Sequence, residues 1–113
     1  MVSQQTKQKV QKLIKEKPIF IAAKSFCSNS DQVKRTIEEI THTSTTEDDD
    51  QVYSINLDLV DDGQEIQDAL TELTGQTTVP NVFIGGEHIG GNTDVQKLKA
   101  SGVLDSKINA VLL

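Results

Sequence analysis

The chain has 113 residues, of which 35% are hydrophobic, and its 17 acidic and 11 basic residues give a formal net charge of -6. This length and apolar content suit one modest hydrophobic core, so we expect residues 1–113 to form a single domain. The negative charge disfavours binding to nucleic acid or anionic lipid, and no stretch approaches the roughly 20 apolar residues that a membrane span needs.

The first part of the chain predicts a helix, a strand and a second helix. Apolar residues recur at helical spacing from Ser3 to Glu16, and Ser3 can serve as the N-cap. The wholly apolar run Ile19–Ala23 is typical of a buried strand. After Cys27, residues 28–31 offer several N-capping side chains, and a helical stripe follows at Val33, Ile37 and Ile40. Cys27 is therefore expected where a strand leads into a helix.

The second part predicts a strand, a helix, a hairpin and two short helices. Residues 41–50 are polar and indicate a solvated connection. Alternation from Val52 to Leu59 predicts a strand, and the helix after it ends at Gly75. Two brief strands flank the turn Gly85–Gly86, and the last helix is expected around residues 108–112. This order predicts an α/β fold with a four-stranded mixed sheet that has helices on both faces.

Cys27 is the residue with the clearest chemical potential. A cysteine at a helix N-terminus meets unpaired backbone N–H groups and the positive end of the helix dipole, which favour the thiolate. Lys24, three residues earlier, can add a positive charge. The alternative is that a lone cysteine acts as a small buried hydrophobe. Because the chain has one cysteine and no basic N-terminal segment leading into an apolar run, we expect a cytoplasmic location.

Three short motifs accompany this cysteine. They are Lys24-Ser25-Phe26-Cys27 after the first strand, Thr78-Val79-Pro80 before the third strand, and Gly90-Gly91-Asn92-Thr93-Asp94 at the start of the fourth helix. Together, at this spacing, they resemble the dithiol class of glutaredoxins over nearly the whole chain. The resemblance implies a thioredoxin-like fold with a cis peptide bond before Pro80.

The same resemblance implies a glutathione site around Cys27, which would be the catalytic thiol. Backbone groups of Val79 would pair with the cysteinyl part of glutathione, the start of the fourth helix with the γ-glutamyl carboxylate, and Asp94 with the α-amine. Lys24 and Gln67 match positions that hold the glycine carboxylate. The implied glutathione-binding residues are Lys24, Ser28, Asn29, Gln67, Thr78, Val79, Pro80, Gly91, Asn92, Thr93 and Asp94.

The chain departs from the family pattern at the active site. Where the dithiol class usually shows Cys-Pro-Tyr-Cys, this chain has Cys27-Ser28-Asn29-Ser30, so it has no second thiol. Asn29 replaces an aromatic side chain, and Thr77 replaces a common arginine, which predicts weaker binding of glutathione. The chain also lacks the extra loop and the Trp-Pro of the Cys-Gly-Phe-Ser class. It therefore resembles a monothiol variant of the dithiol class.

These features predict a glutathione-dependent oxidoreductase that reduces protein–glutathione mixed disulfides through Cys27, as a monomer, with glutathione as cosubstrate and glutathionylated proteins as partners. One alternative is a [2Fe–2S] cluster shared by two chains, in which each chain gives Cys27 and two glutathiones complete the ligands. Another is a diverged glutathione-binding relative with little activity. His42 and His88 show no metal-ligand spacing, so we expect both on the surface and predict no other metal site.

Overall fold

The computed structural model describes residues 3–43 and 51–112, and its elements follow the predicted order. They are α1 (Gln4–Glu16), β1 (Ile19–Ala23), α2 (Ser28–Thr41), β2 (Val52–Asn56), α3 (Gly63–Thr74), β3 (Asn81–Ile84), β4 (Glu87–Gly90), α4 (Asn92–Ser101) and α5 (Val103–Val111). Most of the connection predicted at 41–50 lies outside the described residues. None of the described helices has the length and apolarity to cross a membrane.

The four strands form one mixed sheet in the order β2-β1-β3-β4. β1 pairs in parallel with β2, while β3 runs antiparallel to both β1 and β4. The predicted mixed sheet is thus confirmed. β1 lies at the centre of the sheet and all five of its residues are buried, which explains why its sequence is wholly apolar rather than alternating.

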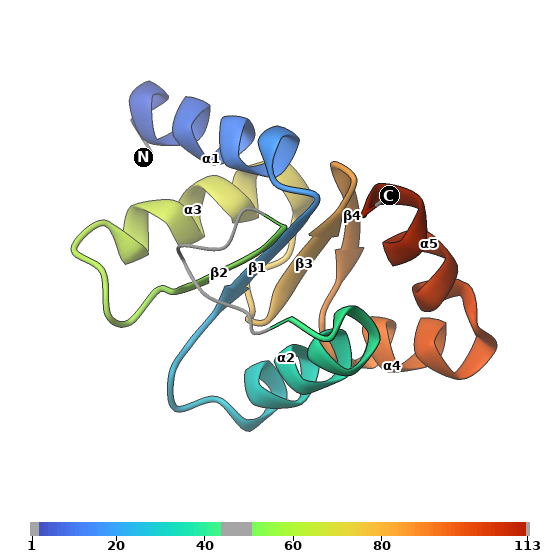
Figure 1. Ribbon diagram of the computed structural model, residues 1–113. Coiled ribbons are helices and arrows are strands. Elements are labelled where there is room, and N and C mark those ends of the chain that lie inside the picture. Colours follow the sequence, from blue (N-terminus) through green and yellow to red (C-terminus); the bar gives the residue numbers. More distant parts are fainter. Residues whose placement is uncertain (1–2, 44–50, 113) are drawn as a thin grey trace.

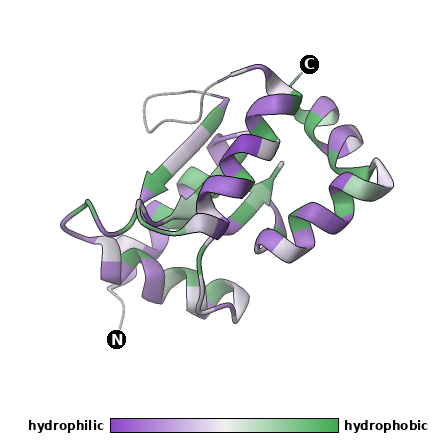
Figure 2. Ribbon diagram, turned by 90° about the horizontal axis from the view of Figure 1, so that it is seen from below, coloured by the Kyte–Doolittle hydropathy of each residue, from purple (hydrophilic) through white to green (hydrophobic). Residues whose placement is uncertain are grey.

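Helices cover both faces of the sheet, as Figure 1 shows: α1 and α3 lie on one face, and α2, α4 and α5 on the other. Each face has its own core, and the alternation of β1 divides its side chains between them. Phe20 and Ala22 pack with α1 and α3, whereas Ile19, Ile21 and Ala23 pack with α2, α4 and α5. Hydrophobic and hydrophilic segments accordingly alternate along the helices in Figure 2, as amphipathic helices require.

Two element boundaries differ from the prediction. β2 ends at Asn56 rather than Leu59, because the Leu59 N–H donates to the Asn56 carbonyl at 3.0 Å and turns the chain away from the sheet. Leu59 is consequently exposed. α5 begins at Val103, earlier than predicted, since Gly102 in the left-handed region ends α4 and the chain resumes a helix at once.

Candidate functional site

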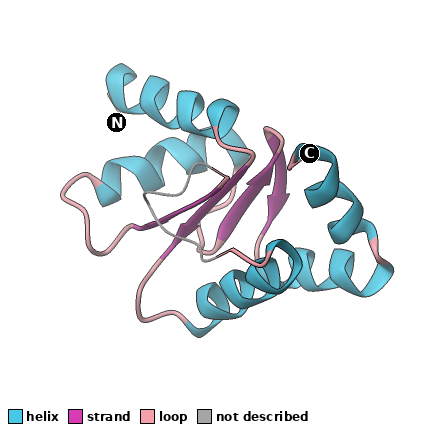
Figure 3. Ribbon diagram, viewed as in Figure 1, coloured by secondary structure: helices cyan, strands magenta, loops and turns pink. Residues whose placement is uncertain are grey.

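The loop after β1 leads into α2 (Figure 3), and Cys27 is the last residue before that helix. It is the N-cap residue of α2, with extended backbone angles, and its carbonyl accepts the Asp31 N–H at 3.1 Å. The predicted position is therefore confirmed. The prediction that a side chain from 28–31 caps the helix is wrong, because the cap position is one residue earlier and makes no side-chain cap bond. The first N–H groups of α2 are left to face the thiol.

The environment of Cys27 lowers the pKa of its thiol. The largest cause is a hydrogen bond from the Ser30 hydroxyl, and the backbone N–H groups of Ser30 and Asn29 act in the same direction. Desolvation and the charge of Asp31 oppose them. Hydrogen bonds to the sulfur favour its charged form, so the thiolate is held by the first turn of the helix. Cys27 itself is partly exposed and thus accessible to a disulfide in solution.

Ser30 is fully buried beneath this thiol. The Lys24 backbone N–H donates to its Oγ at 3.3 Å. Because that contact uses an acceptor lone pair, the hydroxyl hydrogen is free to donate to Cys27. Ser30, which occupies the place of the second family cysteine, is therefore a hydrogen-bond partner of the thiol.

The Lys24 side chain does not act on Cys27 as expected. Its Nζ lies 6.0 Å from the centre of the exposed Phe26 ring, and its charge helps to lower the pKa of Asp58. The main causes at Asp58 are the Ser25 hydroxyl and the Ser25 backbone N–H, which donate to the two carboxylate oxygens at 2.5 and 2.9 Å. This clamp ties the loop before Cys27 to the loop after β2.

A groove of about 490 Å³ lies on one side of the cysteine loop. Three segments that are distant in sequence form it: the first turn of α2, the loop before β3, and the start of α4. Its lining residues are Asn29, Gln76, Thr78, Val79, Pro80, Gly91, Asn92, Thr93 and Asp94. The structure therefore brings together eight of the predicted glutathione-binding residues, and it adds Gln76, which the sequence did not indicate.

A smaller hollow of about 230 Å³ is lined by Lys24, Phe26 and Gln67, together with Leu57, Asp58, Gly63 and Gln64. Lys24 and Gln67, which we predicted to hold the same carboxylate, therefore share one site. Gln67 donates to Thr71 Oγ1 at 3.1 Å. Lys24 and Phe26, which line the smaller hollow, precede Cys27, and Asn29, which lines the groove, follows it. Of the predicted glutathione-binding residues, only Ser28 lines neither hollow; it is exposed at the start of α2.

The loop that leads into β3 has its backbone fixed at the groove. The Val79–Pro80 peptide bond is cis, as the resemblance implied. Gln76 Nε2 donates to the carbonyl oxygens of Thr78 and Pro80 at 3.0 and 2.9 Å, so it bridges the two sides of the bond. Its role depends on how the loop folds back, which no sequence spacing reveals.

The start of α4 forms the far wall of the groove. The Gly91 N–H donates to Asp94 Oδ2 at 3.1 Å, so this carboxylate is fixed at the rim. Gly90 has φ 120°, and a Cβ there would collide with the Asp94 side chain. Gly90 thus permits the close approach of the carboxylate to the backbone.

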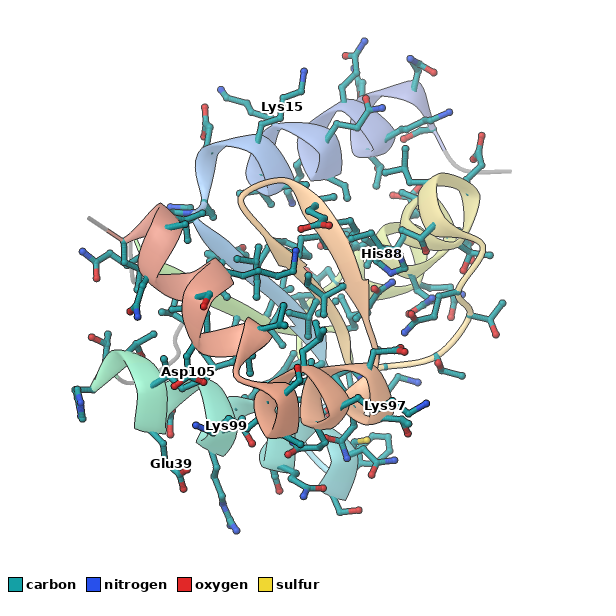
Figure 4. All side chains as sticks on the ribbon, turned by 90° about the vertical axis from the view of Figure 1, so that its right-hand side faces the viewer. Lys15, Glu39, His88, Lys97, Lys99 and Asp105 are labelled. Carbon is teal, nitrogen blue, oxygen red and sulfur yellow. The ribbon has the colours of Figure 1, made fainter. Side chains whose placement is uncertain are left out.

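The histidines lie apart from this groove. Both are exposed, as predicted. His88 lies on β4 (Figure 4), where its Nε2 is 2.8 Å from Oδ1 of the buried Asn81. Within residues 3–43 and 51–112, no group of three His, Cys, Asp or Glu side chains is arranged to hold a metal ion.

Comparison with known proteins shows that the chain is similar to glutaredoxins. A family model described as Glutaredoxin matches residues 19–89. Glutaredoxin-1 of Saccharomyces cerevisiae is 38% identical over 112 residues, which cover 99% of this chain and 98% of that protein. The monothiol glutaredoxin-S10 of Oryza sativa subsp. japonica is 42% identical over 101 residues, which cover 88% of this chain and 57% of that protein.

Solved structures give the same result. A wheat glutaredoxin superposes with a TM-score of 0.86 at 34% identity and covers 99% of this chain and 97% of its own. A buckwheat glutaredoxin–glutathione complex superposes with a TM-score of 0.83 at 34% identity, over 95% of this chain and 90% of that one. The thioredoxin-like fold implied by the three motifs is confirmed.

Proposed function

Because this chain belongs to the glutaredoxin family, we propose that it reduces protein–glutathione mixed disulfides by a mechanism that uses Cys27 alone. The observation that carries the proposal is an accessible thiol of lowered pKa at the N-terminus of α2, beside a groove that contains most of the predicted glutathione-binding residues. The chain has no second cysteine, so no internal disulfide can form during the cycle.

The proposed cycle has two thiol–disulfide exchanges. The Cys27 thiolate attacks the glutathione sulfur of the mixed disulfide, which forms a Cys27–glutathione disulfide and releases the protein thiolate. The thiolate of a second glutathione then attacks the glutathione sulfur of that disulfide, releasing oxidised glutathione and the Cys27 thiolate. The released thiolates take up protons from water according to their pKa values. One cysteine suffices for this cycle. Between turnovers, the hydrogen bond from Ser30 stabilises the Cys27 thiolate.

We propose that the two ends of glutathione occupy the two hollows. Lys24 and Gln67 supply a cation and an amide for the glycine carboxylate in the smaller one. In the groove, the Val79 backbone would pair with the cysteinyl residue, while the first N–H groups of α4 and Asp94 would meet the γ-glutamyl carboxylate and amine. The buckwheat complex supports the assignment of glutathione as the ligand.

Reduction is favoured over cluster binding by the number of thiolates. A [2Fe–2S] cluster takes four, and this chain contains one cysteine, so three ligands would have to come from glutathione and a second chain. The oxidoreductase cycle needs no second chain. The cluster alternative would be recognised by visible absorption and by glutathione-dependent dimerisation of the purified protein.

The test is glutathione-dependent reduction of a glutathionylated peptide by purified protein. We expect turnover by the parent chain and none by Cys27→Ser, while Ser106→Ala, on α5 and outside both hollows, controls for a serine change elsewhere. Turnover that persists in Cys27→Ser, or its absence in the parent, would overturn the proposal.

A further inference from the structure

A chain of side-chain amides joins the first turns of α2 and α4, which lie side by side in Figure 1. Asn92 Nδ2 donates to Asn29 Oδ1 at 3.2 Å and to Gln32 Oε1 at 2.8 Å. Asn92 Oδ1 accepts from Gln96 Nε2 at 3.1 Å. Asn92 lines the groove, but both the nitrogen and the oxygen of its side-chain amide already hydrogen-bond to other side chains of the protein.

The direction of every bond in this bridge is fixed by one backbone carbonyl. The Thr36 hydroxyl donates to the Gln32 carbonyl at 2.9 Å, and a carbonyl can only accept. Thr36 Oγ1 is then an acceptor for Gln96 Nε2 at 3.0 Å, and the same nitrogen donates to Asn92 Oδ1. Asn92 must consequently donate from its Nδ2 to Asn29, and Asn29 must accept this bond with its Oδ1.

The amide nitrogen of Asn29 is the free end of this bridge. Asn29 is exposed and lines the groove, and no described residue hydrogen-bonds to its Nδ2. The side-chain amide of Asn29 therefore offers two N–H donors at a groove that Val79 also lines. Where the family usually has an aromatic side chain, this chain has a directed donor.

We propose that Asn29 determines the ligand specificity of the groove by donating a hydrogen bond from its side-chain amide to the γ-glutamyl carboxylate of glutathione. This inference rests on the proposed function. Amide N–H groups complement a carboxylate oxygen, and the first N–H groups of α4 face the same groove, so donors converge from two walls on one anion. Asn29 was expected from the sequence to weaken glutathione binding, and the proposed bond would supply a polar contact in place of the aromatic one.

The experiment measures an equilibrium rather than turnover. Reduced protein is equilibrated with the thiol and symmetric disulfide of glutathione, or with those of N-acetylcysteinylglycine, which lacks the γ-glutamyl carboxylate and amine. Intact mass gives the fraction of Cys27 in the mixed disulfide, and the quotient of the two equilibrium constants is the selectivity. Any change in the pKa of Cys27 cancels in this quotient.

We expect the parent to prefer glutathione and Asn29→Ala to reduce the selectivity about tenfold, the loss expected for one hydrogen bond to a charged group. Asn29→Asp, which keeps the acceptor for Asn92 but adds a negative charge, should reduce it further. Asn109→Ala, an exposed asparagine on α5, is the matched control. A parent-like selectivity in Asn29→Ala overturns the inference alone, whereas a parent without preference overturns the proposed glutathione site as well.

Discussion

The Ser30 hydroxyl donates to the Cys27 thiol from a fully buried position one helical turn further along α2. Because this bond favours the thiolate, Ser30→Ala should raise the pKa of Cys27. At a pH below the Cys27 pKa of the variant, Ser30→Ala should be alkylated by iodoacetamide more slowly than the parent. The two rates should converge at high pH, where both thiols are ionised. The check is the rate of alkylation across a pH series.

Ser106→Ala, exposed on α5, is the matched control for this change and should leave the alkylation profile as it is in the parent. If Ser30→Ala gives the same profile as the parent, the thiolate depends on backbone N–H groups alone.

The Ser25–Asp58 clamp predicts an acid-dependent part of the stability. The pKa of Asp58 is lowered in the folded state by the Ser25 hydrogen bonds. Its contribution is present above the unfolded pKa of about 4 and is lost as the pH falls through the lower folded value. Urea unfolding should show that Asp58→Asn is less stable than the parent at neutral pH and that the difference shrinks in acid.

Ser25→Ala should remove most of the same pH dependence, and the double variant should lose no more than the larger single loss. Additive losses would show that the two residues act independently.

Gln76 joins the carbonyl oxygens on the two sides of Pro80. Gln76→Ala removes both bonds, which should lower the free energy of unfolding by about 1–2 kcal/mol. It should also raise the KM for glutathionylated peptide, because the groove-lining backbone of Val79 loses its support. Gln5→Ala, exposed on α1, is the control. An unchanged KM would show that the loop keeps its conformation without Gln76.

Gly63, the first residue of α3, is packed against the backbone where the chain leaves β2. A Cβ at this position would collide with the Leu57 carbonyl oxygen, and backbone cannot move aside as a flexible side chain can. Gly63→Ala should therefore destabilise the fold by about 3 kcal/mol in urea unfolding. Gln64→Ala, at the next and exposed position, should change stability little; equal losses in the two variants would contradict this packing argument.

The sequence predicted what depends on neighbours in the chain. Hydrophobic periodicity gave the order of elements, and the run Ile19–Ala23 gave the central strand because burial on both faces requires apolar residues throughout. It failed at β2, where Leu57 and Leu59 continue the alternation but the turn at Asn56 takes Leu59 out of the sheet.

At the site, the motifs identified the residues that line the groove, but not the side chains that hold them. Gln76 acts on a loop that folds back over it, and Asn92 meets Asn29 across 63 positions of the sequence. Lys24 was expected to act on Cys27, yet it acts on Asp58. Such pairings depend on distances that only the folded chain defines.

On the proposed mechanism, Cys27 takes the glutathione half of a mixed disulfide. Reduced protein is mixed with one equivalent of a glutathionylated peptide, without free glutathione, and its intact mass is read after a single exchange. We expect a protein that has gained one glutathione, together with free peptide thiol. A protein that carries the peptide instead would contradict the proposed mechanism, because Cys27 would then have taken the peptide half of the disulfide rather than the glutathione half.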